Sequence, residues 1–169
     1  MAQAGIFSEG DRVELIEGEV VNMSPIGSIH AGCVNRLTAL LSEKLGKRVV
    51  VGVQNPIRID EHSEPEPDIA LLKPRRDYYA DAHPTPRDAL LIIEVADSSL
   101  EYDRTVKLLL YARAGIPESW IVNLLDDAIE THSEPRDGKY QASRVFHRGE
   151  TIVAQTVANL ALNVDEILG

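Results

Sequence analysis

Two short apolar runs in the middle of the chain each contain one carboxylate, and this pattern restricts the fold most. Residues 68–73 (DIALLK) and 89–95 (ALLIIEV) are almost continuously apolar, as strands buried on both faces of a sheet are. Asp68 opens the first run and Glu94 lies near the end of the second. A buried carboxylate is unfavourable unless it is paired or binds a metal. We therefore expect both runs centrally in a sheet, with partners for both acids.

The remaining elements mix strands and helices. The sequence predicts a hairpin over residues 13–23, a helix over 29–45, extended segments over 48–53 and 57–59, and an irregular connection over 74–87. It also predicts a helix that opens at a capping box over 98–101 and ends near 114, strands over 119–124, 128–133 and 139–145, and a short helix over 164–168. This order indicates one α/β or mixed α+β domain over residues 1–169, with a central mixed sheet flanked by helices.

Composition excludes several functional classes. The chain has 17 Lys and Arg against 27 Asp and Glu, and a net charge of -10 argues against a generally basic surface for nucleic acid. Cys33 is the only cysteine, which excludes a disulfide framework and a cysteine-ligated zinc site within one chain. Residues 1–5 lack the features of a secretory leader, and no stretch approaches the roughly 20 apolar residues of a membrane span. We expect a cytoplasmic protein without a membrane partner.

Most of the negative charge lies in one stretch. From Glu61 to Asp103 there are 11 acidic and 4 basic residues, which is -7 of the net -10. Charge blocks of this kind are usually solvated surface. A divalent cation bound among the carboxylates is the alternative, since it would relieve their repulsion.

A lysine in the following helix is a candidate partner for the acids. Lys107 lies 13 residues after Glu94, and Asp103 and Tyr111 lie four residues to either side of it on the same helical face. Two carboxylates with a backbone carbonyl such as that of Val95 can hold Mg²⁺, while an ammonium orients a water. The residues alone leave another interpretation open, in which the strand acids are solvated and Asp103 and Lys107 form an ordinary exposed ion pair.

Several motifs follow one another in a fixed order along nearly the whole chain. They are residues 14–25 (ELIEGEVVNMSP) followed by His30, Pro67-Asp68, residues 92–99 (IIEVADSS), Asp103, Lys107, residues 111–117 (YARAGIP), residues 120–123 (WIVN) and the closing segment 160–168. In this order and spacing the chain resembles the Uma-two family of restriction-endonuclease-like proteins, within the PD-(D/E)XK nuclease superfamily. The resemblance implies a restriction-endonuclease-like core in which Asp68 and Glu94 are metal ligands.

One position departs from the superfamily's plain pattern. That pattern has a lysine two residues after the second acid, where this chain has Ala96. The resemblance suggests that Lys107 supplies the amine from the helix instead. It also matches His30 in the first helix and Glu17 or Glu19 in the hairpin to family positions that can approach the metal. For His30, a structural hydrogen bond to a backbone carbonyl is the alternative.

The expected function is Mg²⁺- or Mn²⁺-dependent hydrolysis of a nucleic-acid phosphodiester, with DNA as the substrate. In this hypothesis Asp68, Glu94 and the Val95 carbonyl hold the metal, Lys107 positions the attacking water, and Asp103 orients Lys107, with Tyr111 as a further candidate. Two alternatives remain: a module that keeps the nuclease fold for binding or assembly, which the net charge favours, and a hydrolase of a small phosphorylated metabolite.

We also expect a homodimer, because a lone acidic domain offers little surface to hold a duplex. Four apolar residues of the late strands are candidates for a self-complementary interface, although they could equally be core: Ile129, Tyr140, Val145 and Phe146.

Overall fold

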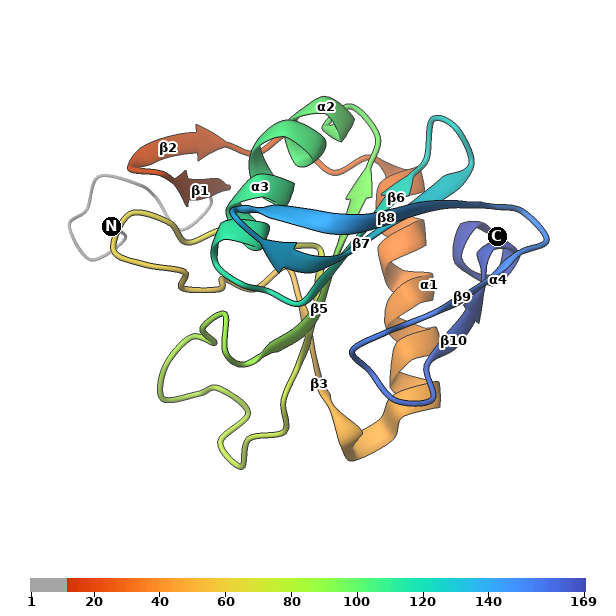
Figure 1. The fold of residues 1–169 in the computed structure, drawn as a ribbon, viewed down its shortest axis with the longest axis horizontal. Helices are drawn as coiled ribbons and strands as arrows, with labels where there is room; N and C mark the ends of the chain where they lie inside the picture. The colour runs from red at the N-terminus through yellow and green to blue at the C-terminus, as the bar shows by residue number, and fades with distance from the viewer. Residues whose placement is uncertain (1–11) are drawn as a thin grey trace.

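The computed structural model describes residues 12–169, so the opening segment 1–5 lies outside the described residues. Its centre is a six-stranded sheet (Figure 1). The strands are, in spatial order, β3 (Val50–Val53), β4 (Ile69–Leu72), β5 (Ala89–Ala96), β6 (Glu118–Asn123), β7 (Ala128–Arg136) and β8 (Lys139–His147). β5 and β6 are parallel and the other neighbours antiparallel. The expected mixed sheet is confirmed, and both carboxylate-bearing runs lie inside it.

Helices cover both faces of the sheet, because the side chains of β5 alternate between two apolar clusters. Leu91, Ile93 and Val95 pack with the buried side of α1 (Ser28–Leu45). The C-terminal α4 (Val164–Leu168) and the small hairpin of β9 (Thr151–Val153) and β10 (Ala161–Asn163) join this cluster. Ile92 faces the other way and packs with Tyr111. Tyr111 belongs to the helical connection from β5 to β6, which consists of α2 (Leu100–Tyr102), the π-helical η3 (Asp103–Lys107) and α3 (Leu108–Arg113).

The N-terminal hairpin lies beside the sheet as a separate two-stranded unit. It pairs β1 (Val13–Ile16) with β2 (Glu19–Asn22) around Gly18, whose φ of 85° suits a residue without a side chain. Glu14 and Ile16 are the buried positions of β1, as expected for a strand with one covered face. Backbone hydrogen bonds of 2.7 Å from Glu64 to Leu15 and from Gly18 to His62 attach the hairpin to the loop before β4. The side chain of Glu14 is thereby directed inward.

Two local expectations were wrong, and one pair of short strands was not foreseen. The predicted capping box does not form, because α2 begins at Leu100 and the Ser99 hydroxyl donates to the carboxylate of Asp103 at 2.7 Å instead of capping the helix. Residues 57–59 form no strand. The pair β9–β10 was not predicted, since its strands are only three residues long.

The expected interface residues of the late strands mostly belong to the core. Ile129 and Phe146 are buried in the cluster that contacts α1. Tyr140 is half-buried and its hydroxyl donates to the carbonyl of Ile116 at 2.8 Å. Only Val145, with 50% of its surface exposed, remains available to a partner. These four residues therefore do not form the apolar surface that the expectation required.

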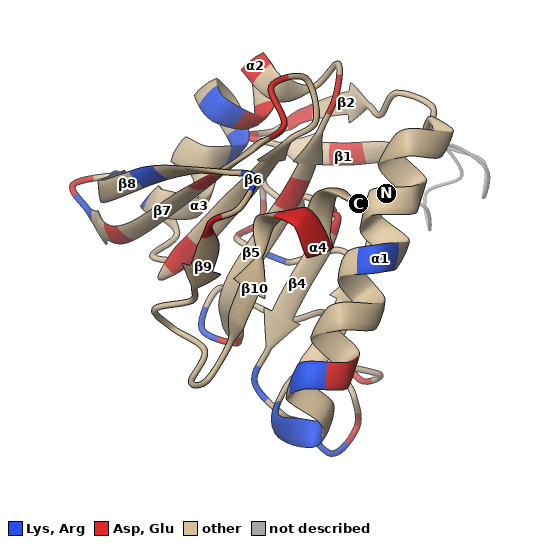
Figure 2. Cartoon of the chain, turned by 90° about the vertical axis from the view of Figure 1, so that its right-hand side faces the viewer, with Lys and Arg blue, Asp and Glu red and all other residues tan. Residues whose placement is uncertain are grey.

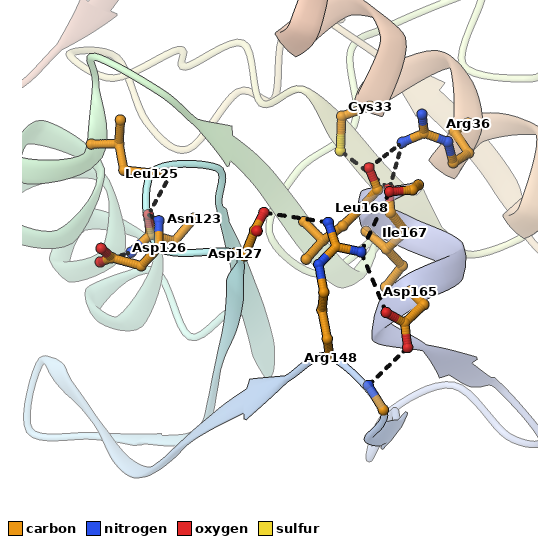
Figure 3. A network of polar contacts seen from close by, with 12 residues as sticks. Cys33, Arg36, Asn123, Leu125, Asp126, Asp127, Arg148, Asp165, Ile167 and Leu168 are labelled. Atoms are coloured by element: carbon orange, nitrogen blue, oxygen red, sulfur yellow. Dashed lines mark hydrogen bonds and ion pairs between the residues drawn. The ribbon is translucent and has the colours of Figure 1, made fainter.

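Polar contacts hold the C-terminal helix in place (Figure 3). Arg36 of α1 donates to the carbonyls of Ile167 and Leu168, both at 2.9 Å. Arg148 connects Asp127 to Asp165, with distances of 3.4 and 3.3 Å. The end of the chain is thus attached to both α1 and the β6–β7 turn.

Candidate active site

The antiparallel pairing of β4 and β5 brings Asp68 and Glu94 together. Ile69 is in register with Ile93, so the residue before β4 lies beside the next residue of β5. The backbone N–H of Asp68 is 3.4 Å from Glu94 Oε2, and the N–H of Val95 donates to Asp68 Oδ2 at 2.8 Å. The two acids that are 26 positions apart in sequence therefore meet at one end of the sheet.

They line a pocket of about 360 Å³ between the hairpin, the start of α1 and the helical connection. All the residues expected to hold the metal, position the water or orient the lysine line this pocket, and so does His30; they are Asp68, Glu94, Val95, Lys107 and Asp103. Figure 2 shows acidic residues at this end of the molecule, on β1, α2 and β5, whereas the far end of α1 and the turn after it carry Lys44, Lys47 and Arg48.

Lys107 occupies the centre of the polar network. Its Nζ lies 2.9 Å from Glu94 Oε1 and 2.9 Å from Glu14 Oε1, and these side chains are nearly inaccessible to solvent. The hydroxyl of Tyr111, one turn further on, donates to Glu94 Oε1 at 2.5 Å. Because an ammonium has three protons, two ion pairs leave Lys107 one donor for another acceptor.

The π-helical turn η3 determines how this lysine is presented. Asp103 and Lys107 are its first and last residues, and both are buried. π-helical turns are rare in proteins, and those that occur inside α-helices are often found at functional sites. Asp103 was expected to orient Lys107, but the hydrogen bond that the structure gives its carboxylate comes from Ser99. The ion pairs of Lys107 are formed with Glu14 and Glu94 instead.

Glu14 is the site residue that the sequence reasoning missed. It is 4% exposed and also accepts the backbone N–H of Glu66 at 2.8 Å. Its position on the same face of β1 as Ile16 was the available signal. The two hairpin acids that were expected instead do not line the pocket. Glu17 pairs with Arg113 at the surface, 2.6 Å away, and Glu19 is exposed.

His30, near the start of α1, pairs directly with Asp68. The distance from its Nε2 to Asp68 Oδ2 is 3.0 Å, and the amide of Gln54 donates to Asp68 Oδ1 at 3.2 Å. The hydrogen bond with Asp68 raises the pKa of His30 more than burial lowers it, and the negative charge of Asp68 adds to the rise. Burial alone would raise the pKa of Asp68, but the combined effect of these partners lowers it.

The acids on the other side of the pocket behave differently. Burial raises the pKa of Glu94 to about 8, against the opposing charge of Lys107. Burial likewise raises the pKa of Asp103 to about 6, partly offset by Lys107 and by the hydrogen bond from Ser99. Burial lowers the pKa of Lys107, but the surrounding carboxylates reverse this and raise it overall. Carboxylates thus outnumber cations in a poorly solvated space.

The donor chemistry fits a divalent cation. Six acids among the described residues line the pocket, against three cations when His30 is protonated, so the lining carries a charge of -3 when all of them are ionised; the acids are Glu14, Glu66, Asp68, Glu94, Asp97 and Asp103, and the cations are Arg12, His30 and Lys107. Glu94 Oε2 accepts only the long 3.4 Å contact, so it is less engaged than either oxygen of Asp68. Among residues 12–169, no three His, Cys, Asp or Glu side chains form a ready-made metal cluster. Mg²⁺ needs only one or two protein carboxylates, because it keeps several waters.

Comparison with known proteins places the fold. A solved structure described as a putative nuclease belonging to DUF820, from Anabaena variabilis ATCC 29413, superimposes with a TM-score of 0.75. The alignment covers 98% of this chain and 94% of that chain at 13% sequence identity, which establishes a common fold. No curated protein matches the chain. Within residues 12–169, no helix combines the length and apolar character needed to cross a bilayer.

The family comparison agrees with the order of the motifs. The model of the Uma2 family, whose description is "Putative restriction endonuclease", matches residues 2–165. This match spans the hairpin, the pocket and all six strands of the central sheet. The chain is a member of the Uma2 family.

Proposed function

We propose that this protein is a Mg²⁺- or Mn²⁺-dependent endonuclease that hydrolyses phosphodiester bonds of DNA. The observation that carries the proposal is the convergence of Asp68, Glu94 and Lys107 in one pocket, from two strands and a helix that are distant in sequence. Membership of a restriction-endonuclease-like family supports the same activity.

Asp68 and Glu94 would hold the cation, with the backbone carbonyl of Val95 as a further oxygen ligand. A divalent cation bound there neutralises charge on the phosphate and makes a water a stronger nucleophile. Tyr111 holds Glu94 in position through the 2.5 Å hydrogen bond, and Gln54 holds Asp68. The ligands are therefore oriented by neighbours, as is usual for metal sites.

Lys107 positions the attacking water through its third N–H, which neither of its two ion pairs uses. Glu14 and Glu94 fix the ammonium from two sides at 2.9 Å, so its remaining N–H has a defined direction. Asp103 contributes negative charge that keeps Lys107 protonated, since it is among the groups that raise the lysine's pKa. In this proposal Asp103 acts through charge, and Glu14 takes over the orienting role.

Cleavage assays on three substrates test the proposal. Supercoiled plasmid, a short labelled oligonucleotide and a small phosphate ester are each incubated with Mg²⁺, with Mn²⁺ and with a chelator. Metal-dependent nicking of plasmid that the Asp68→Asn variant lacks supports the endonuclease. Hydrolysis of the small ester alone supports a metabolite hydrolase. Binding of DNA without any cleavage supports a nuclease-fold binding module.

The proposed enzyme acts as a homodimer, because two copies would offer a duplex more surface than one acidic chain. Light scattering after size exclusion measures the mass with and without Mg²⁺. A monomer of 18.6 kDa in both conditions would contradict the dimer and leave the cleavage proposal to the assays above.

A further inference from the structure

The carboxylates of the pocket already engage several hydrogen-bond donors around them. Lys107 pairs with Glu14 and Glu94, Ser99 with Asp103, and His30 with Asp68, while Tyr111 and Gln54 reach Glu94 and Asp68 from outside the pocket lining. A phosphodiester presents only acceptor oxygens and negative charge. It needs donors that the carboxylates have not taken.

Tyr102 carries such a donor. Its hydroxyl is buried and has no hydrogen-bond partner among the described residues, although the side chain lines the pocket with Asp68, Glu94 and Lys107. A buried hydroxyl without a partner is unfavourable, and such groups in native proteins call for an explanation. The Nδ1 atom of His30 is also buried without a partner, but that ring is held by Asp68.

The π-helical turn explains why Tyr102 faces the pocket at all. In a regular α-helix, residues five positions apart point about 140° away from each other, so Tyr102 and Lys107 would lie on different faces. The wider turn of η3, with its i to i+5 hydrogen bonds, reduces this angle. Both residues consequently line the same pocket, with Asp103 between them in sequence.

We propose that the Tyr102 hydroxyl donates a hydrogen bond to a phosphate oxygen of the substrate, which makes Tyr102 a substrate-binding residue. This inference rests on the proposed phosphodiester substrate. Since the hydroxyl is buried in the structure, the arriving phosphate displaces neighbouring atoms and gives the hydroxyl its missing acceptor. The energetic cost of the unpartnered group is then recovered on binding, in the manner of a site preorganised for its ligand.

Substitution of this residue separates a binding role from a structural one. Tyr102→Phe removes only the hydroxyl, so the thermal midpoint of the variant should equal or exceed that of the unchanged protein. Its affinity for a short fluorescein-labelled DNA duplex, measured by anisotropy with Ca²⁺, should fall roughly ten- to hundredfold, because a hydrogen bond to a charged acceptor is lost. The kcat/KM for cleavage of the same duplex with Mg²⁺ should fall by a similar factor.

Tyr140→Phe is the matched control. Its hydroxyl has a partner, the carbonyl of Ile116, and does not line the pocket. This variant should lose roughly 2–4 °C in thermal midpoint and keep its DNA affinity and cleavage rate. We therefore expect Tyr102→Phe to lose DNA affinity and keep its thermal midpoint, and Tyr140→Phe to lose thermal midpoint and keep its DNA affinity.

Two outcomes overturn the inference while leaving the proposed function in place: a Tyr102→Phe protein that binds and cleaves normally, and one whose midpoint falls together with its affinity. If the unchanged protein neither binds nor cleaves the duplex, the proposed function itself fails, and the substrate contact fails with it.

Discussion

The ammonium of Lys107 lies 2.9 Å from Glu14 and 2.9 Å from Glu94, so one side chain of a helix connects the N-terminal hairpin to a central strand. Lys107 therefore has a structural role, as the counter-charge of two buried carboxylates, and a proposed chemical role in positioning the attacking water. Without the lysine, two buried carboxylates would face each other with no counter-charge. The hairpin pairs with no strand of the main sheet, so this contact adds to the backbone hydrogen bonds that attach it to the loop before β4.

Lys107→Ala is expected to abolish most of the turnover and leave metal binding largely intact, because the amine acts on the water and not on the cation. It should also lower the free energy of unfolding by about 3 kcal/mol, since it leaves buried charges unpaired. Cleavage rates, calorimetric titration and urea denaturation measure the three effects. The exposed Lys139→Ala is the control, and an active Lys107→Ala enzyme would contradict the assigned role.

Asp68→Asn is expected to remove most of the affinity for Mg²⁺ and Mn²⁺. In the unchanged protein these ions should raise the thermal midpoint, with a stabilisation that grows as RT ln(1 + [L]/Kd). Isothermal titration with each ion compares the variant with Asp127→Asn, an exposed carboxylate that pairs with Arg148. Equal affinity in all three proteins would rule out a metal site at Asp68.

Asp103 gives a pH dependence whose sign follows from burial. Its pKa rises from 3.8 to about 6 on folding, so the folded state holds its proton more tightly than the unfolded state does. The free energy of unfolding therefore falls as the pH rises from about 4 to 6, and this group's contribution stays lower above pH 6. The Asp103→Asn variant should not show this loss. Above pH 6 its free energy of unfolding should exceed that of the unchanged protein by at most about 3 kcal/mol.

Urea denaturation at pH 4, 5, 6 and 7 measures this difference. The difference should be smallest at pH 4, which is close to the unfolded-state pKa of 3.8, because there the carboxyl is protonated in the folded state and partly protonated in the unfolded state. A difference that stays constant from pH 4 to 7 would show that Asp103 does not titrate in this range.

Among residues 12–169, Arg12 is the arginine that lines the pocket, where its guanidinium donates to the carbonyl of Ser24 at 3.4 Å. We expect it to neutralise one DNA phosphate, because arginine matches phosphate geometry. Arg12→Ala should weaken duplex binding and reduce the slope of log K against log salt by about 0.9. Anisotropy titrations over a salt series measure the slope, with the distant Lys47→Ala as control. Parallel lines for Arg12→Ala and the unchanged protein would exclude this contact.

The sequence alone determined the central strands, the two strand acids and the helix that carries the lysine. Continuous apolar runs have few other uses in a chain of this size, and an acid inside one needs a partner. Asp68 and Glu94 could therefore be singled out before their pairing was known. Lys107 could be named because helical spacing placed it on a face with Asp103 and Tyr111.

Only the tertiary structure decided which of these groups contact each other. Glu14 reaches Lys107 because a loop attaches the hairpin to the rest of the fold, and four-residue strands carry too little periodicity to show which acids point inward. Glu17 and Glu19 could not be distinguished from Glu14 on residue type. Ion pairs between distant segments follow from packing, which local patterns do not encode.

The π-helical turn is the clearest case of this kind. Residues 103–107 have the composition of an ordinary helix, and regular 3.6-residue periodicity predicts an Asp103–Lys107 pair. The burial of Lys107 between two carboxylates and the bond from Ser99 to Asp103 accompany a wider turn instead. The sequence thus determined which side chains could form the site, whereas packing of the hairpin and helix against β5 decided their partners, because buried charges require long-range contacts to be stable.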